Sequence, residues 1–167
     1  MGKPTKIQKT NATRLLDHAG ISYTLIPYAV DEEHLDAIHV AAELGEDIRL
    51  VYKTLVLQGA GVGLFVCVIR GDKEVDLKKA AKVIGAKKVE MLPMKNLLSN
   101  TGYIRGGCSP IGMKKELPTI IQEECLNHDY IYISAGKRGL QICISPRELI
   151  SFVNAKVADV AADNEVG

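Results

Sequence analysis

Residues 50–57 constrain the fold most, because they predict a buried strand with one charge set into it. They are almost all β-branched, aromatic or leucine, with Asp47 before them and Gly59 after them. Side chains alternate across a strand, so Lys53 points the same way as Val51 and Leu55. An ammonium there either extends past the strand end into solvent or faces a cavity that holds an anionic or polar ligand.

The length of 167 residues fits one domain with a single core, which we assign to residues 1–160. Hydrophobic residues make up 47% and charged residues 25%, which is ordinary for a globular protein. Helical and strand patterns are mixed along the chain without an internal repeat or a linker. We therefore expect an α+β domain with a mixed or mostly antiparallel sheet.

The first half predicts two helices and two strands around the Lys53 strand. Thr5 is the expected cap of a helix that ends at Gly20, and residues 21–28 form a strand in which Pro27 indicates an edge or a bend. Residues 31–45 predict an acidic helix with Leu35, Ile38, Ala41 and Ala42 inward and Gly45 as its C-cap. The glycines between residues 57 and 64 indicate a hairpin loop, since no G-x-G-x-x-G pattern with a following helix is present.

The second half predicts shorter elements. Asp76 should cap a lysine-rich helix that ends at Gly85, and Pro93 should begin a helical turn. Strands are expected at residues 64–70, 87–91, 118–122, 130–134 and 140–145, and a last helix runs from Pro146 to about 154. We expect residues 161–167 to be a frayed tail.

No apolar run approaches the roughly 18 residues of a membrane span, and residues 1–6 resemble neither a signal core nor a lipidation signal. We therefore expect a cytoplasmic protein. The four cysteines lack metal-ligand spacing and are expected to be reduced. His34 and His39 are five residues apart on a predicted helix and so point in different directions, and we expect no metal site. We expect no cofactor either.

A second stretch, Gly106-Gly107-Cys108-Ser109-Pro110, raises the weight of the cavity hypothesis for Lys53. Paired glycines let backbone N–H groups approach a ligand, and such a loop can donate to an oxyanion or a carbonyl. A structural turn at a sheet corner is the alternative. Covalent catalysis by Cys108 or Ser109 is disfavoured because no base has an evident relation to either. The turn from Ser134 to Gly139 repeats the pattern of small residues with positive charge.

Four motifs, in order, resemble the YbaK/EbsC family of freestanding aminoacyl-tRNA deacylases, which is akin to the editing insertion domain of bacterial prolyl-tRNA synthetase. The resemblance covers about residues 7–160. It rests on Val51-Tyr52-Lys53-Thr54-Leu55, on Asp76-Leu77-Lys78-Lys79-Ala80 with residues 85–91, on Thr101-Gly102-Tyr103 with residues 106–112, and on Tyr132-Ile133-Ser134-Ala135-Gly136-Lys137-Arg138-Gly139-Leu140.

The resemblance implies a barrel-like mixed sheet flanked by helices and hydrolysis of mischarged Cys-tRNA(Pro) to cysteine and tRNA(Pro). It implies aminoacyl-tRNA as the substrate and prolyl-tRNA synthetase as a partner. It makes Lys53 the essential residue, which positions the aminoacyl ester and the tRNA 3′ end. The implied substrate pocket contains Tyr28, Thr54, Gly106, Gly107, Cys108, Ser109, Pro110, Ser134 and Gly136. The family's proposed mechanism uses the substrate's own thiol rather than a protein nucleophile.

Charge is distributed unevenly although the net charge is +1. Residues 31–47 hold seven acids and no Lys or Arg, whereas residues 73–88 hold six lysines. If the chain binds tRNA, we expect phosphate contacts from the basic cluster Lys78, Lys79, Lys82, Lys87 and Lys88. A set of solvated lysines is the alternative.

Three departures from the family pattern bear on specificity. Cys108 replaces an aliphatic residue, Gln141 replaces an acid found in some members, and residues 31–47, which should form part of the pocket wall, match poorly. Two other functions stay open at this point. One is water-dependent hydrolysis of Ala-tRNA(Pro) or of a broader range of aminoacyl-tRNA, and the other is a noncatalytic module that binds tRNA or the synthetase.

Overall fold

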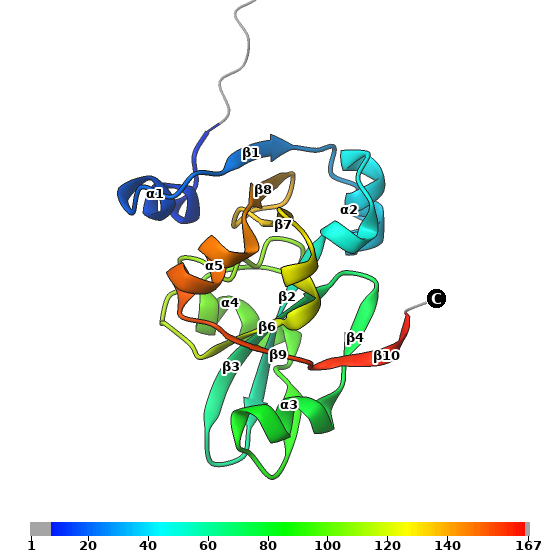
Figure 1. The fold of residues 1–167 in the computed structure, drawn as a ribbon, viewed down its shortest axis with the longest axis vertical. Helices are drawn as coiled ribbons and strands as arrows, with labels where there is room; N and C mark the ends of the chain where they lie inside the picture. The colour runs from blue at the N-terminus through cyan, green and yellow to red at the C-terminus, as the bar shows by residue number, and fades with distance from the viewer. Residues whose placement is uncertain (1–7, 166–167) are drawn as a thin grey trace, which may run out of the picture.

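The computed structural model describes residues 8–165, and the chain folds around the long hairpin that carries Lys53 (Figure 1). The α-helices are α1 Asn11–His18, α2 Ala37–Leu44, α3 Leu77–Ile84, α4 Leu97–Thr101 and α5 Pro146–Val153. The 3-10 helices are η1 Ile48–Leu50, η2 Met94–Asn96 and η3 Glu123–Asn127. The strands are β1 Thr24–Pro27, β2 Tyr52–Gly59, β3 Gly63–Arg70, β4 Lys73–Val75, β5 Val89–Met91, β6 Thr119–Gln122, β7 Ile131–Ser134, β8 Leu140–Ile144, β9 Lys156–Ala158 and β10 Ala161–Glu165.

The strands form one mixed sheet and two smaller antiparallel sheets. The main sheet has the order β5-β2-β3-β6-β9, with antiparallel pairs around β2 and parallel pairs on both sides of β6. A second sheet has the order β1-β8-β7, and β10 pairs with β4. An isolated bridge between Val51 and Tyr132 joins the first two sheets. The α+β class with a mixed sheet and flanking helices is confirmed, although the sheets do not close into a barrel.

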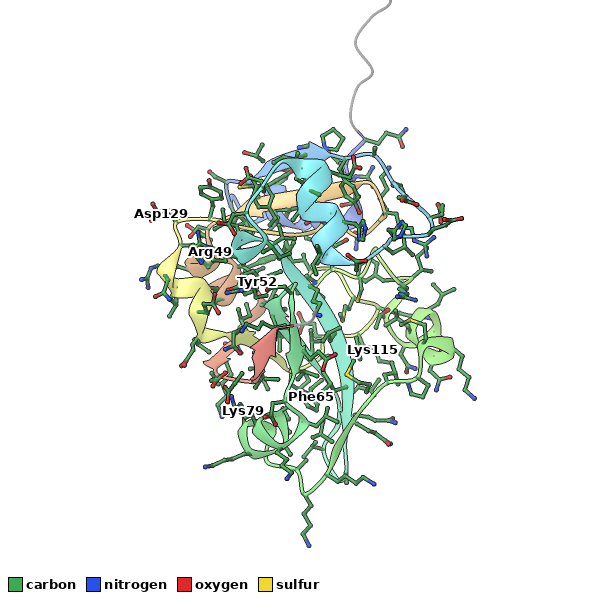
Figure 2. The ribbon with its side chains drawn as sticks, turned by 90° about the vertical axis from the view of Figure 1, so that its right-hand side faces the viewer. Arg49, Tyr52, Phe65, Lys79, Lys115 and Asp129 are labelled. Atoms are coloured by element: carbon green, nitrogen blue, oxygen red, sulfur yellow. The ribbon has the colours of Figure 1, made fainter. Side chains whose placement is uncertain are left out.

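The β2–β3 hairpin separates two apolar clusters, as the alternation of its side chains predicts. Tyr52 and Val56 belong to a cluster with strands β7 and β8, whereas Leu57 and Phe65 belong to a second cluster with α3. Figure 2 shows Tyr52 and Phe65 towards opposite ends of the hairpin. Lys53 pairs with Ile69 and lies on the same strand face as Leu55, which packs against the second cluster. The predicted strand is therefore confirmed from Tyr52 onward, whereas Leu50 lies in η1 and Val51 forms only an isolated bridge.

The first two helices begin later than predicted, because in each case a later polar residue caps the helix. Thr10, not Thr5, caps α1, and its side chain and that of Thr13 bond reciprocally to each other's backbone. Thr5 lies outside the described residues. Asp36 caps α2 by accepting from the His39 amide, at 2.9 Å. The buried face of α2 also differs in part from the prediction. Ala41 is buried as predicted and Val40 is buried as well, whereas Ile38 and Ala42, predicted to be inward, are exposed.

The sequence predicted the edge strand β1 correctly but not the C-terminal strand β10. Pro27 lies in β1, which is an edge strand of its sheet, as its missing N–H predicts. The tail differs from the prediction, because residues 161–165 form β10 instead of fraying. The buried Gln122 Oε1 accepts hydrogen bonds from the Val160 and Ala161 amides at 2.8 and 3.0 Å. The Asp76 amide donates a hydrogen bond to the Val160 carbonyl. These contacts are distant in sequence and hold the segment against β4. Residues 166–167 lie outside the described residues.

Candidate active site

A cavity of about 290 Å³ lies along the start of β2, close to the lower end of the range for small-ligand sites (roughly 300–1,000 Å³). Strand β2 contributes Lys53 and Thr54. The start of α2 and the segment from β5 to α4 form two walls, and the Gly106 loop closes a third side. The complete lining is Leu35, Asp36, Ala37, Val40, Val51, Tyr52, Lys53, Thr54, Leu55, Val56, Gly71, Met91, Leu92, Met94, Leu97, Arg105, Gly106, Cys108, Ser134 and Gln141.

Lys53 is half-buried in this cavity, and within residues 8–165 no hydrogen bond or ion pair engages its ammonium group. Burial lowers the pKa of Lys53 below that of a free lysine, because a charged ammonium loses hydration there. The carboxylates of Glu74, Asp72 and Asp36 oppose this by raising the pKa. The three carboxylates thus partly offset the cost of burying a charged Lys53. Because no residue of the described chain bonds to its ammonium group, this group can contact a ligand.

Three further residues of the lining, Tyr52, Thr54 and Gln141, have a buried polar side-chain atom without a partner in the described part of the chain. Thr54 Oγ1 and Gln141 Oε1 are both inaccessible to solvent and accept or donate no hydrogen bond within the described part of the chain. Gln141 is only 5% exposed, although it is a long amide side chain. Leaving a buried polar atom unpaired costs about 1–3 kcal/mol. A ligand whose binding brought a hydrogen-bonding group to either atom would recover that free energy.

The two glycine-rich loops predicted from sequence pack against each other and form one wall. A Cβ on Gly107 would lie 3.0 Å from the Lys137 Cα, so a larger residue would push the backbone of this turn away. Gly106 has φ +83°, in the left-handed region that favours glycine. Arg138 bridges three segments: its Nε donates to the Arg105 carbonyl, and its guanidinium forms an ion pair with Glu32, each at 2.8 Å.

Of Lys53 and the nine residues predicted for the substrate pocket, half line the cavity and half do not. Lys53, Thr54, Gly106, Cys108 and Ser134 line the cavity, whereas Gly107, Ser109, Pro110 and Gly136 do not. The Ser109 hydroxyl accepts from the Ile111 amide, and the Ser134 hydroxyl accepts from the Gly136 amide, at 3.2 and 3.1 Å. Both hydroxyls therefore shape their own loops. Tyr28 lines a small neighbouring hollow that shares Leu35 and Val40 with the cavity.

No side chain of the lining is a prepared nucleophile. Burial raises the pKa of the Cys108 thiol to about 12, so this thiol is neutral near pH 7. No histidine is among the residues that line the cavity. Asp36 is the cap of α2 and bonds to His39, which occupies its carboxylate. The site can orient a substrate and present charge and backbone groups, without a nucleophile–base pair of its own.

A metal centre finds no support in residues 8–165, where no group of three or more metal-ligating side chains occurs. The relation of His34 to His39 differs from the prediction, since the two rings stack with centroids 4.3 Å apart. The helix begins only at residue 37, so helical geometry does not separate the rings. Each ring bonds to a nearby carboxylate, Asp31 or Asp36, at 2.8 Å.

The predicted basic cluster lies apart from the cavity lining. Lys79 forms ion pairs with Asp159 and Asp163, at 3.0 and 3.1 Å, and its cationic charge is already balanced. Figure 2 shows Lys79 on α3, apart from Lys115. Lys78, Lys82, Lys87 and Lys88 are exposed but do not line the cavity. Their assignment to tRNA phosphates stays a prediction.

Sequence reasoning missed the wall made by Met91, Leu92, Met94 and Leu97. These residues carry no functional signal, because methionine and leucine at such spacing equally predict core. It also missed Arg105 as a cavity residue. Residues 35–37 and Val40 do form part of the wall, as the family resemblance implies for the acidic segment, and Gln141 lines the cavity as a candidate altered contact.

No helix in the described part of the chain has the length and apolar character needed to cross a bilayer. Fold and site together define an α+β domain with a half-buried lysine in a cavity of small-ligand size. Relatives of the chain give its class, which is that of an aminoacyl-tRNA deacylase.

Comparison with known proteins gives the family. The chain belongs to the aminoacyl-tRNA editing domain family, whose pattern matches residues 31–152. It is 48% identical over 160 residues to the "Putative Cys-tRNA(Pro)/Cys-tRNA(Cys) deacylase EbsC" of Enterococcus faecalis, covering 96% of this chain and 98% of the relative. The predicted YbaK/EbsC resemblance is thereby confirmed.

Solved structures agree on the fold. A "putative trans-editing enzyme for prolyl tRNA synthetase" superposes with a TM-score of 0.77 at 22% identity, over 93% of this chain and 99% of the other. A hypothetical protein of known crystal structure gives a TM-score of 0.82 at 24% identity, over 90% and 98% of the two chains. At these identities the likeness concerns the fold alone.

Proposed function

We propose that this enzyme hydrolyses mischarged Cys-tRNA(Pro) to free cysteine and tRNA(Pro). The observation that carries the proposal is the half-buried Lys53, unengaged by any residue of the described chain, beside the unpartnered Thr54 Oγ1 and Gln141 Oε1. A cation next to unpaired polar atoms suits a small polar group joined to an anionic chain. The 48% identical relative, named as a Cys-tRNA deacylase, supports cysteine as that group.

In this proposal Lys53 contacts the substrate near the 3′-terminal ribose or its phosphate and holds the ester in the cavity. Thr54 and Gln141 then bond to polar atoms of the aminoacyl group. Backbone groups of the Gly106 loop face the carbonyl oxygen as negative charge develops on it. Catalysis would come from orientation and electrostatics, which alone can account for several kcal/mol of barrier lowering.

The nucleophile in the proposed reaction is the thiol of the substrate. Its sulfur attacks the ester carbonyl of the same cysteinyl group, the thiol proton passes to the departing ribose oxygen, and the carbon–oxygen bond breaks. The resulting cyclic thioester then takes up one water molecule and opens to free cysteine. This route needs no protein nucleophile, in agreement with the high pKa of Cys108 and the absence of histidine from the lining.

Such a hydrolysis is useful because one amino-acid pocket discriminates only weakly between small side chains. Cysteine and proline are similar in size, and a single pocket separates such small side chains by only about 10–200-fold, so a second site is needed to remove errors. We propose that the enzyme acts in the cytoplasm together with prolyl-tRNA synthetase, which would supply the mischarged tRNA. Cofactors are not required by this chemistry.

The test is a deacylation time course on Cys-tRNA(Pro), Ala-tRNA(Pro) and Ser-tRNA(Pro) at substoichiometric enzyme. We expect rapid loss of cysteine alone, because serine has a much weaker nucleophile at the same position. Loss of alanine as well would replace the thiol route with attack by water. Loss of none of the three, with tRNA still bound, would favour a noncatalytic binding module.

A further inference from the structure

The cavity has an apolar wall that continues onto the surface. Met91, Met94 and Leu97 line the cavity, and Met91 and Met94 are 41% and 59% exposed. Leu98, next in the same segment, is 57% exposed. We call Met91, Met94, Leu97 and Leu98 the methionine strip. A run of large apolar side chains held open at the mouth of a polar cavity loses hydrophobic free energy unless a ligand covers it.

The strip is fixed to the strand that carries Lys53. Met91 ends β5 opposite Leu57, and the Leu92 amide donates to the Val56 carbonyl at 3.0 Å. Pro93 then begins η2, and the Thr101 hydroxyl donates to the Leu97 carbonyl at 2.8 Å. The exposed side chains therefore belong to a braced segment rather than to a loose loop.

Exposed basic residues border the strip. Lys95 lies within η2, and Arg105 lines the cavity on the opposite wall. The backbone of Lys114 lies next to the end of α4, because its amide donates to the Thr101 carbonyl at 2.9 Å. All three side chains are exposed, in contrast to Lys79, which is engaged by two carboxylates. An apolar strip with a basic border fits a nucleotide, whose base is flat and apolar on its faces and whose phosphate is anionic.

We propose that the methionine strip binds the base of the 3′-terminal adenosine of the substrate, while Lys95, Arg105 and Lys114 face the phosphates of the adjoining nucleotides. The proposal rests on the proposed function, since it places the nucleoside that carries the ester. Unbranched, polarizable thioethers fit the face of a base closely, and bases stack against aromatic and apolar side chains alike. The base would then hold the ester over Lys53 from one side, and Thr54 and Gln141 would hold the amino acid from the other.

Uncharged RNA hairpins test the inference without hydrolysis. One hairpin carries the acceptor stem and ends in CCA, and the other lacks only the terminal adenosine. We expect the terminal adenosine to tighten binding on the order of tenfold, as base stacking does elsewhere. Met94→Ser combined with Met91→Ser should remove this difference and raise KM for deacylation more than it lowers kcat. Val62→Ser, at the tip of the β2–β3 hairpin and 42% exposed, is the matched control and should keep the difference.

Each outcome bears on a separate claim. Equal affinity of the unmodified enzyme for both hairpins would overturn the adenosine site, and continued deacylation would leave the proposed function intact. An equal loss in the Val62 control would also overturn it, since the effect would then be general. Absence of deacylation of every aminoacyl-tRNA by the unmodified enzyme would reject the proposed function instead.

Discussion

Lys53 is the residue whose environment explains most about the site. Its stem runs along an apolar strand face, its ammonium reaches the cavity, and Glu74, Asp72 and Asp36 offset part of the cost of its burial. The alternation of side chains along the strand, read from the sequence, correctly predicted that Lys53 shares a strand face with Leu55. Its acidic neighbours come from β4, the β3–β4 turn and the cap of α2, and no local pattern reveals that these three meet.

The lowered pKa of Lys53 gives a pH prediction. If catalysis needs the protonated lysine, kcat/KM falls as pH rises through a pKa below the ordinary value of 10.5. Glu74→Gln removes the carboxylate that raises this pKa most, so the alkaline limb should shift to lower pH. The measurement is a pH profile of kcat/KM, corrected for spontaneous ester hydrolysis. An unchanged profile in Glu74→Gln, or the same shift in the distant Glu123→Gln, would contradict this account.

At the scale of elements, the loop from Arg105 to Cys108 depends on the turn that follows β7. Arg138 donates to the Arg105 carbonyl and pairs with Glu32, and so connects the walls formed by three separate segments. The sequence identified both loops as glycine-rich and basic. It did not indicate that the Arg138 guanidinium is engaged within the protein, because both of its partners are distant in the sequence.

Arg138→Lys keeps the charge and loses the planar fork, so it separates a positioning role within the protein from a contact with phosphate. We expect kcat to fall roughly tenfold to a hundredfold, because a small displacement of a positioning group has effects of that size. The salt dependence of tRNA binding should not change, since no phosphate contact is lost. A shallower salt dependence with unchanged kcat would instead indicate that Arg138 contacts a phosphate.

At the scale of the whole molecule, a buried ionic group joins segments that are distant in the sequence. Arg70, 9% exposed at the end of β3, pairs with Asp72 at 2.7 Å and with Glu124 of η3 at 3.0 Å. This group joins the β2–β3 hairpin to η3, which follows β6. The sequence predicted the class, the hairpin and most strands, because apolar alternation and glycine turns are local signals. It did not predict β4, β9 and β10, which are short and depend on distant partners such as Gln122.

Asp72→Asn should lower the free energy of unfolding by about 3 kcal/mol, because it leaves a buried guanidinium without one of its anionic partners. Pairing with Arg70 also lowers the pKa of Asp72 below 3.8. Its contribution to stability is therefore present above that value and is lost as pH falls through the lower folded-state pKa. Denaturant titrations at pH 7 and below pH 4 measure both effects. A variant as stable as the unmodified enzyme at pH 7 would reject this role for Asp72.

The central claim is that Lys53 makes this cavity a deacylase site, and the most direct measurement is the rate of Cys-tRNA(Pro) hydrolysis by Lys53→Ala. The account predicts loss of turnover with an unchanged thermal unfolding transition, while Lys9→Ala, at an exposed lysine outside both the cavity and the basic cluster, keeps full activity. Undiminished hydrolysis by a correctly folded Lys53→Ala enzyme would contradict the account.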